Sequence, residues 1–374
     1  MSWCGIEGQD RAVSFLLRTA EASRLAHAYL FQGPPGVGKA MTAAALARYL
    51  VCSAEGERPC GVCRQCREAL EGNHPDIVTL VPRGKSRQIA IEQIRSLLQA
   101  ARLNARQGDW KVFIVDEAET MGMEAANALL KTLEEPQPGT VLILVTSRPD
   151  LLPPTIVSRC QPVNFKPWSR DRLAELVSTL LPGEDPEHLS RLAAGSPGRV
   201  VAMAESGFLP VRTRVLEVVE ANWRSKGAQA EAAAREVLDL LAVAEKAAAR
   251  GLDNRRRQDL EPYQMKEEEK KDQAAAAAAR AEFLRMVLEI VLRWYWDLYL
   301  FQNLGEEGIL TNRDRLEPLR AMARMEPGSL IRAAALLEEA GEGLFRRNTS
   351  PELVLAGLFS RLGALVSPAG GQES

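Results

Sequence analysis

The chain has 374 residues, of which 46% are hydrophobic, and its formal net charge at pH 7 is −2. This length allows two or three domains with sizeable cores. The small net charge excludes attraction of nucleic acid by the field of the whole protein, so any such contact needs a local basic face. We expect a cytoplasmic protein without a membrane partner, because the sequence has no run of about 18 apolar residues and no basic segment followed by an apolar one at its start.

A phosphate-binding loop is predicted near the start of the chain. After an amphipathic helix over 11–26, residues 28–31 form an apolar strand, and the glycine-rich segment 33–39 joins it to a helix over 41–50. Backbone N–H groups, the helix N-terminus and the Lys39 ammonium would hold phosphate oxygens. The residues expected to contact nucleotide here are Gly33, Pro34, Pro35, Gly36, Val37, Gly38, Lys39 and Ala40. The alternative for this segment is a glycine-rich turn with a solvated lysine.

Position 40 departs from the phosphate-loop pattern. The pattern G-x-x-x-x-G-K-[ST] places a hydroxyl on Mg²⁺ directly after the lysine, and this chain has Ala40 there. We therefore expect that ATP or ADP can bind, that Mg²⁺ binds weakly, and that hydrolysis by this chain alone is weak or absent.

Four of the six cysteines lie in a short insert over 52–66. They are Cys52, Cys60, Cys63 and Cys66. Four thiolates without a histidine are typical of a closed structural zinc site. Disulfide pairing is the alternative, which we disfavour in a chain without a secretion signal. The pattern predicts one structural Zn²⁺ in a small peripheral module.

A basic turn follows the next short strand. Arg83, Lys85 and Arg87 precede a helix over 91–98. Basic residues at a helix entrance can hold a nucleic-acid phosphate, and a solvated charged turn explains the sequence equally well.

An acidic pair ends the apolar strand over 110–117. In phosphate-loop proteins the first acid, here Asp116, holds Mg²⁺ through water, and the second, here Glu117, can polarise the attacking water. The alternative is a pair of helix-capping acids. A helix over 123–133 and a strand over 141–145 come next, so strands and helices continue to alternate. This alternation predicts an α/β fold with a doubly wound parallel sheet and ligands at the carboxyl ends of its strands.

Several linked motifs of the first two hundred residues resemble those of the clamp-loader branch of the AAA+ ATPases. They are HAYLFQGPPGVGK, the four-cysteine insert, VFIVDEAE, NALLKTLEEP and Leu152–Cys160, which ends in Ser-Arg-Cys. The resemblance implies a P-loop AAA+ domain over 1–166 and a small helical lid over 167–206. It further implies an all-α oligomerisation domain over 207–374, a collar that holds the subunits in a ring.

The resemblance also implies roles for three residues outside the phosphate loop. Arg159 is similar to the family's arginine finger, which reaches the γ-phosphate in a neighbouring subunit, a task that suits a planar, permanently charged guanidinium. Thr146 resembles the sensor at the end of the following strand, and Arg199 resembles the second sensor on the lid. Without the family, Arg199 would be interpreted as an ordinary arginine at a helix start.

The remainder of the chain is predicted to be helical. An alanine-rich helix over 228–250 is followed by a charged stretch over 253–272, which we interpret as a solvated linker or a helix extension. A helix over 283–301 carries apolar residues almost all round, among them Trp294 and Trp296. Core packing explains such aromatics, and a contact between one face and a partner is the other interpretation.

The function implied by the resemblance is that of an accessory subunit of the clamp loader of a replicative DNA polymerase holoenzyme, which is a nucleotidyltransferase. Its expected partners are other clamp-loader subunits of the gamma/tau and delta types, the sliding clamp and primed DNA. The alternative is an autonomous gamma/tau-type clamp-loader ATPase, against which Ala40 speaks. A signalling or repair ATPase is a third class, which the cysteine insert and the Ser-Arg-Cys sequence disfavour.

Overall fold

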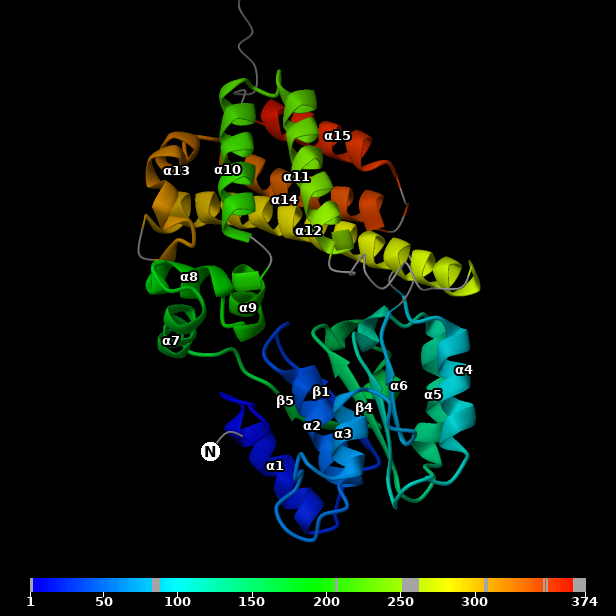
Figure 1. The fold of residues 1–374 in the computed structure, drawn as a ribbon. Helices are drawn as coiled ribbons and strands as arrows, with labels where there is room; N and C mark the ends of the chain where they lie inside the picture. The colour runs from blue at the N-terminus through cyan, green and yellow to red at the C-terminus, as the bar shows by residue number, and fades with distance from the viewer. Residues whose placement is uncertain are drawn as a thin grey trace, which may run out of the picture. The chain divides into compact units, whose positions relative to one another are not determined.

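The computed structural model describes residues 3–82, 88–205, 208–250, 262–305, 309–345, 347 and 349–365. The chain forms two compact units, Met1–Val201 and Ala202–Ser374, and each is described by itself (Figure 1). The basic turn at 83–87 and the first part of the charged stretch, 253–261, lie outside the described residues. The expected domain borders at 166 and 206 stay predictions.

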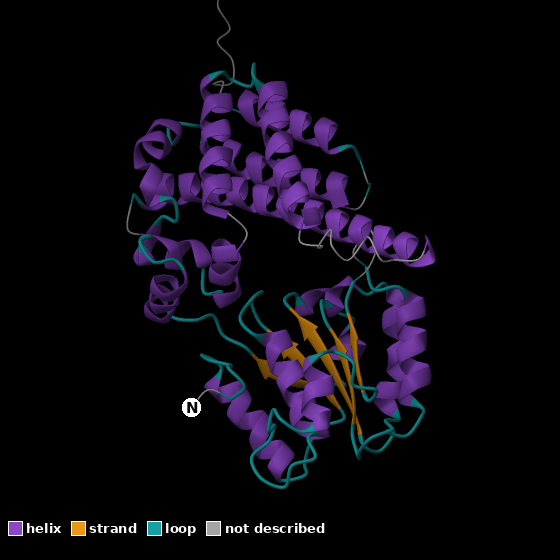
Figure 2. Cartoon of the chain, viewed as in Figure 1, coloured by secondary structure: helices purple, strands orange, loops and turns teal. Residues whose placement is uncertain are grey.

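The first unit is built on a parallel sheet, whose strands are orange in Figure 2. The sheet has five strands in the order β2-β3-β4-β1-β5. The strands are β1 (Ala28–Gln32), β2 (Ile77–Leu80), β3 (Lys111–Val115), β4 (Thr140–Thr146) and β5 (Gln161–Asn164). Every residue of β3 and β4 is buried, as expected for strands that helices cover on both faces. The predicted α/β fold with a doubly wound parallel sheet is therefore confirmed.

Alternate side chains of β1 belong to two different hydrophobic clusters, one on each face of the sheet. Tyr29 and Phe31 pack with the first two helices, whereas Ala28 and Leu30 pack on the other face with α4 (Ile91–Ala101) and α5 (Met123–Glu134). The helices up to the end of the sheet are α1 (Asp10–Glu21), α2 (Lys39–Val51), α3 (Arg64–Leu70), α4 (Ile91–Ala101), α5 (Met123–Glu134) and α6 (Pro154–Val157).

The first helix ends at Glu21, earlier than the expected end at residue 26. Ser23 has a φ of +53°, and a left-handed residue cannot continue a right-handed helix. Three further helices, α7 (Arg170–Leu180), α8 (Pro186–Ala193) and α9 (Pro197–Glu205), follow the sheet in the segment where a helical lid is expected.

The described part of the second unit is helical. Its helices are α10 (Phe208–Arg224), α11 (Ala230–Arg250), α12 (Pro262–Leu304), α13 (Leu316–Met322), α14 (Pro327–Phe345) and α15 (Pro351–Ala364). The helix expected over 283–301 is the second half of α12, so residues 262–272 of the charged stretch form a helix extension. Trp294 is fully buried in the core, whereas Trp296 is 56% exposed and stacks on Tyr299. Core packing thus explains only part of the aromatic set.

Within the second unit, a buried polar network connects the segment after α12 to α10 and α12. Arg212 on α10 donates to both carboxylate oxygens of Asp314 at 2.7 and 2.8 Å and to Asn312 Oδ1 at 2.7 Å. The fully buried Asp297 on α12 accepts from the backbone N–H groups of Thr311 and Asn312 at 3.0 and 2.6 Å. Each buried charge therefore has hydrogen-bonded partners, as burial demands.

No helix in the described ranges is long and apolar enough to span a membrane.

Candidate nucleotide site and metal centre

The phosphate loop joins β1 to α2, and α2 begins at Lys39. Lys39 is only 7% exposed, and its Nζ donates to the carbonyl oxygens of Gly33 at 2.7 Å and Pro34 at 2.6 Å. Burial lowers the pKa of the Lys39 ammonium, and the negative charges of Glu119 and Asp116 partly offset this. An entering phosphate would have to replace the two carbonyl oxygens as acceptors of the Lys39 protons.

A cavity of about 450 Å³ opens beside this loop, where β3 and β4 end. It is lined by Pro35, Gly36, Gly38, Lys39, Ala40, Met41, Asp116, Glu117, Glu119, Val145, Thr146, Ser147 and Gly198. The structure thus brings together the phosphate loop, the acidic pair and the candidate sensor Thr146. The cavity lies at the carboxyl ends of parallel strands, where open α/β sheets bind ligands.

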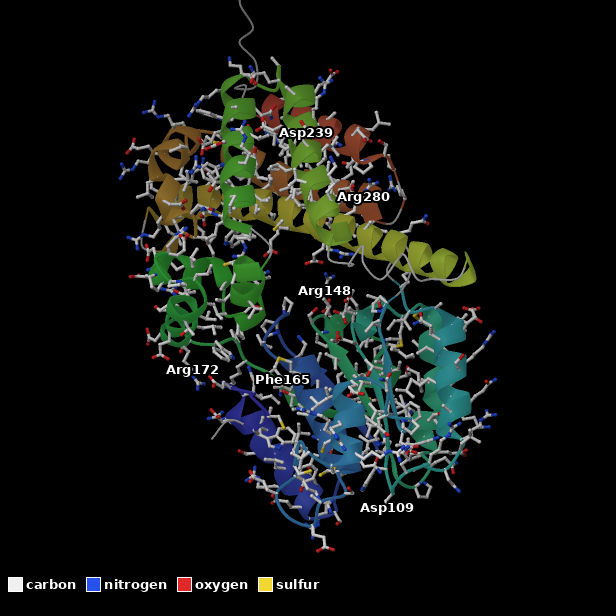
Figure 3. The ribbon with its side chains drawn as sticks, viewed as in Figure 1. Asp109, Arg148, Phe165, Arg172, Asp239 and Arg280 are labelled. Atoms are coloured by element: carbon white, nitrogen blue, oxygen red, sulfur yellow. The ribbon has the colours of Figure 1, made fainter. Side chains whose placement is uncertain are left out.

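The acidic pair and the candidate sensor are held by short backbone contacts. Asp116 Oδ1 accepts from the N–H of Glu117 at 2.9 Å, and Glu117 has a left-handed φ of +47°. Thr146 is 1% exposed, and its Oγ1 accepts from the N–H of Arg148 at 3.0 Å. Arg148 is labelled in Figure 3. The Thr146 hydroxyl therefore shapes the turn after β4, and its role as a sensor stays a prediction.

One polar contact between two residues that line the cavity, Glu119 and Ser147, was missed in the sequence analysis. Glu119 Oε1 accepts from the Ser147 N–H at 3.1 Å and from its hydroxyl at 2.7 Å. Burial raises the pKa of Glu119, but hydrogen bonds from Ser147 and Thr146 outweigh it, and the pKa lies below its ordinary value. Glu119 belongs to the same acidic run as Asp116 and Glu117, which is the one signal that could have pointed to it.

Gln9 was missed as well. It is 4% exposed, and its Nε2 donates to Lys166 O at 2.7 Å and to Val37 O at 3.2 Å, while its Oε1 accepts from the Lys166 N–H at 3.0 Å. Gln9 thereby ties the phosphate loop to the segment after β5. The sequence around it carries no local signal for these contacts, because its partners lie 28 and 157 positions away.

The start of α9 touches the phosphate loop. Gly198 N–H donates to the carbonyl oxygen of Gly36, and Ser196 Oγ accepts from the Arg199 N–H at 3.2 Å. Gly198 lines the cavity, whereas Arg199 is not among the described residues that line it. The role of Arg199 as a second sensor stays a prediction.

Arg159 lies just after α6 and is also not among the described residues that line the cavity. Its side chain is 36% exposed, and its guanidinium donates to Glu134 Oε1 at 2.6 Å and to the carbonyl oxygen of Thr155 at 3.0 Å. In this chain Arg159 is therefore a surface residue. Its action on a neighbouring subunit stays a prediction.

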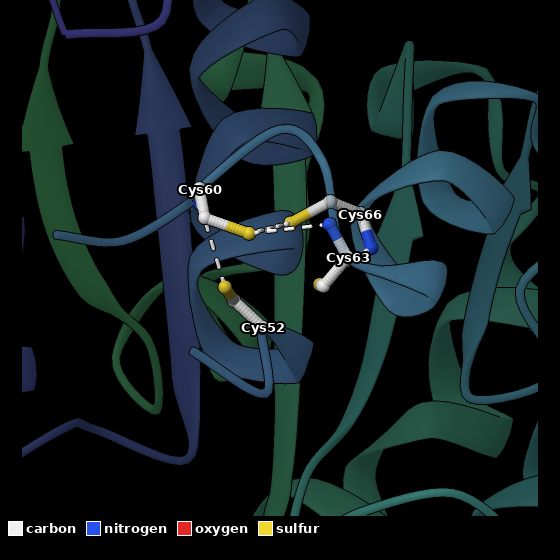
Figure 4. A group of neighbouring side chains, drawn as sticks. All are labelled: Cys52, Cys60, Cys63 and Cys66. Carbon is white, nitrogen blue, oxygen red and sulfur yellow. Dashed lines mark hydrogen bonds between the residues drawn. The ribbon is translucent and has the colours of Figure 1, made fainter. Parts of the chain in front are cut away.

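The four cysteines of the insert form one cluster (Figure 4). Their Sγ atoms all lie within 4.8 Å of one another. Those of Cys60 and Cys66 are 4.0 Å apart, close to the roughly 3.8 Å expected between thiolates at 2.3 Å from one tetrahedral Zn²⁺. All six cysteines are free, so the structure has the expected cluster and not the disulfide alternative. Cys52 directly follows α2 and Cys66 lies in α3, so a metal ion here would join these two helices.

Hydrogen bonds to sulfur suit the cluster to a metal ion. The N–H groups of Cys63 and Cys66 each donate to the preceding cysteine Sγ at 3.3 Å. Burial raises the pKa of Cys63, but donors from Cys66 and Ser53 outweigh it and lower this pKa to about 6. Burial raises the pKa of Cys66 to about 12. A bound metal ion would therefore have to deprotonate Cys66, as coordinating metals do.

Comparison with known proteins assigns the family. The family model described as DNA polymerase III, delta subunit, matches residues 8–169. DNA polymerase III subunit delta' of Bacillus subtilis is 35% identical over 225 residues, 59% of this chain and 67% of that protein. The delta' subunit of Pseudomonas aeruginosa is 38% identical over 203 residues, 52% of this chain and 61% of that protein. DNA polymerase III subunit tau of Escherichia coli is 30% identical over 277 residues, 67% of this chain and 41% of that protein.

Among solved structures, a DNA polymerase III gamma subunit-related protein from Thermotoga maritima aligns with a TM-score of 0.44 and 16% identity, over 94% of this chain and 99% of that one. The sequence matches are more informative. The chain spans 67% and 61% of the two delta' subunits described above. The resemblance to the clamp-loader branch of the AAA+ ATPases is therefore borne out at the level of family, and the chain belongs to the DNA polymerase III subunit delta' family.

Proposed function

We propose that this chain is a cytoplasmic accessory subunit of a clamp loader, which helps to place a sliding clamp on primed DNA within a replicative polymerase holoenzyme. It would assemble with ATPase subunits of the gamma/tau type and with a delta-type subunit. Membership of the delta' family supports this proposal. The observation that carries it is the position of Arg159, which is partly exposed at the surface and is not among the described residues that line the chain's own nucleotide cavity.

In the proposed mechanism Arg159 supplies its guanidinium to the γ-phosphate in the pocket of the adjacent ATPase subunit. A permanently charged planar fork can spread hydrogen bonds over several phosphate oxygens and stabilise the charge of the transition state. The chain would thus act as an activator, and its helical second unit would hold it in the ring.

The chain's own pocket is proposed to bind nucleotide without effective turnover. Ala40 supplies no hydroxyl for Mg²⁺, and the Lys39 ammonium is engaged by two carbonyl oxygens of its own loop. Asp116 and Glu117 line the cavity, and in a hydrolysing relative two such acids would hold Mg²⁺ and polarise water. The four-cysteine cluster is proposed to bind one structural Zn²⁺.

An autonomous gamma/tau-type ATPase is the second candidate. Similarity to tau subunits favours it, since the tau subunit of Salmonella typhimurium is 34% identical over 203 residues. Ala40 speaks against it. ATP hydrolysis by the pure chain separates the two, because only the autonomous enzyme should turn over ATP without partners.

The decisive experiment reconstitutes the complete clamp loader with Arg159→Ala in this chain and measures ATP hydrolysis stimulated by clamp and primed DNA. We expect the site facing this subunit to lose about 10³–10⁵-fold in rate, the range typical of arginine fingers, while assembly is kept. Arg159→Lys should rescue poorly, because the ammonium loses the planar fork. Arg95→Ala is the control, since Arg95 forms another exposed ion pair of the same unit, with Glu124 at 3.1 Å. An unchanged rate with Arg159→Ala would overturn the proposal.

A further inference from the structure

Glu134 is the carboxylate partner of Arg159. Its Oε1 accepts from Arg159 Nη2 at 2.6 Å, and the side chains are 51% and 36% exposed. Arg159 Nη1 donates to the carbonyl oxygen of Thr155 at 3.0 Å. Two groups of this chain, one from α5 and one from α6, therefore hold the guanidinium at the surface.

These contacts leave room for an anion. A guanidinium has five N–H donors, and among the described residues the contacts with Glu134 and Thr155 use two of them. Three donors remain for phosphate oxygens of a neighbour. Glu134 can thus stay bound to Arg159 while Arg159 binds a phosphate.

The backbone segments that carry Glu134 and Arg159 are anchored by buried neighbours. Leu133, next to Glu134, is 3% exposed, and Ile156 and Cys160 on either side of the Arg159 turn are 0% and 7% exposed. All three belong to the same hydrophobic cluster between the sheet and α5. A side chain whose supporting residues are locked by packing can be held in one geometry.

A contribution to folding stability alone does not account for the Glu134–Arg159 ion pair. Exposed ion pairs contribute little to the free energy of folding. Glu134 is also the last residue of α5, where the negative end of the helix dipole disfavours a carboxylate. A cation bound to the Glu134 carboxylate offsets this unfavourable interaction with the helix dipole, which favours the contact with Arg159.

We infer that Glu134 is a positioning residue, which fixes the Arg159 guanidinium in the orientation needed to meet the γ-phosphate of the adjacent subunit. This inference rests on the proposed function of Arg159. Without the carboxylate, Arg159 would sample several rotamers, and the effective concentration of the correct one at the neighbour's phosphate would fall.

The test introduces Glu134→Gln into this chain within the complete complex. Stimulated kcat should fall about 10- to 100-fold, the size of effect expected from a misplaced catalytic group, while KM for ATP stays unchanged because ATP binds in the neighbour's pocket. Glu134→Asp keeps the charge on a shorter side chain and should retain more activity than Glu134→Gln. Melting temperature and assembly should not change.

Two matched controls isolate the effect. Glu124→Gln breaks the exposed pair with Arg95, and Glu135→Gln removes the next carboxylate along the chain. Both should keep the normal rate. In a chain that already carries Arg159→Ala, Glu134→Gln should cause no further loss, since both changes act through one contact.

The outcomes separate this inference from the proposed function. If Arg159→Ala abolishes stimulation but Glu134→Gln leaves kcat unchanged, the positioning role is wrong and the finger stands. A faster rate with Glu134→Gln would make Glu134 a competitor of the phosphate and would equally overturn the inference. If Arg159→Ala itself has no effect, the proposed function fails, and the role of Glu134 fails with it.

Discussion

The backbone N–H of Gly198 donates a hydrogen bond of 2.9 Å to the carbonyl oxygen of Gly36. This bond attaches the first turn of α9 to the phosphate loop. Gly36 has a φ of +70°, and a Cβ at this position would lie 2.2 Å from Ser196 Oγ. The contact therefore depends on glycine for its backbone conformation and for its space.

Gly36→Ala should weaken the contact between the phosphate loop and the start of α9 more than Gly38→Ala does. Both positions have positive φ, but a Cβ at Gly38 meets no atom within 4 Å. Alanine in the left-handed region costs about 1–2 kcal/mol at either site, and only at position 36 does the clash with Ser196 add to it. We expect faster amide hydrogen exchange over 196–199 in Gly36→Ala alone, partly reversed by adding Ser196→Ala. Equal exchange in the two glycine variants would contradict the contact.

Ala40→Thr should strengthen Mg²⁺-dependent nucleotide binding. The new hydroxyl would occupy the place that Ser or Thr takes in the phosphate-loop pattern. Calorimetric titration with ATP, with and without Mg²⁺, measures the gain, and the unmodified chain should hydrolyse ATP negligibly. Ala44→Thr makes the same change at an exposed position one turn later in α2 and should have no effect. Rapid hydrolysis by the pure unmodified chain would contradict the prediction.

One zinc ion should be found for each chain purified under reducing conditions. Cys52→Ser and Cys66→Ser should abolish it, because both side chains belong to the cluster. Cys4→Ser and Cys160→Ser are the controls, and both proteins should keep the metal. Elemental analysis measures the ratio of zinc to protein, and a metal-free chain whose four clustered thiols are paired as disulfides would sink the assignment.

Asp297 should make the stability of the second unit depend on pH. Burial raises the pKa of its carboxyl above the ordinary 3.8, although hydrogen bonds from Thr311 and Asn312 partly offset this. The folded chain then binds the proton more tightly than the unfolded chain. The contribution of Asp297 to stability is therefore fully present below pH 3.8 and is lost as the pH rises through its folded-state pKa.

Comparison with Asp297→Asn isolates this contribution, because all other groups titrate alike in both proteins. As the pH rises from 3.8 towards neutrality, the free energy of unfolding of the variant should gain relative to that of the unmodified chain. Denaturant titration at each pH measures it. Asp239→Asn on α11 (Figure 3) controls for the loss of an exposed carboxylate. A constant difference between the Asp297→Asn variant and the unmodified chain would contradict the prediction.

The parts of the fold that follow from local pattern were predictable. Continuous apolar runs indicated β1, β3 and β4, since strands buried on both faces need them. The spacing of Cys60, Cys63 and Cys66 indicated the cysteine cluster. Chain order alone placed Asp116 near the phosphate loop, because carboxyl ends of parallel strands meet at one edge.

The contacts that depend on tertiary neighbours were not predictable. The Gln9 amide joins segments far apart in the chain, and no periodicity reports such a partner. The direction of the Lys39 ammonium depends on which carbonyl oxygens face it. The charged residues 262–272 suggested either a linker or a helix, and the buried second half of α12 decides for the helix, because propagation adds one hydrogen bond per residue to an existing helix.

One helix, α2, begins at the phosphate-loop lysine and is followed directly by a cysteine of the cluster. α2 begins at Lys39, has 13 residues and is followed at once by Cys52, so it is a rod of about 20 Å. At its start, the Lys39 ammonium donates to two carbonyl oxygens of the phosphate loop. At its end, Cys52 connects it to the cysteine cluster. If a metal ion binds the cluster, its removal would free only the end of α2 at Val51, so fraying would start there. Among the hydrogen-bonded amides of α2, those nearest the phosphate loop, beginning with Thr42, would then be the last to exchange.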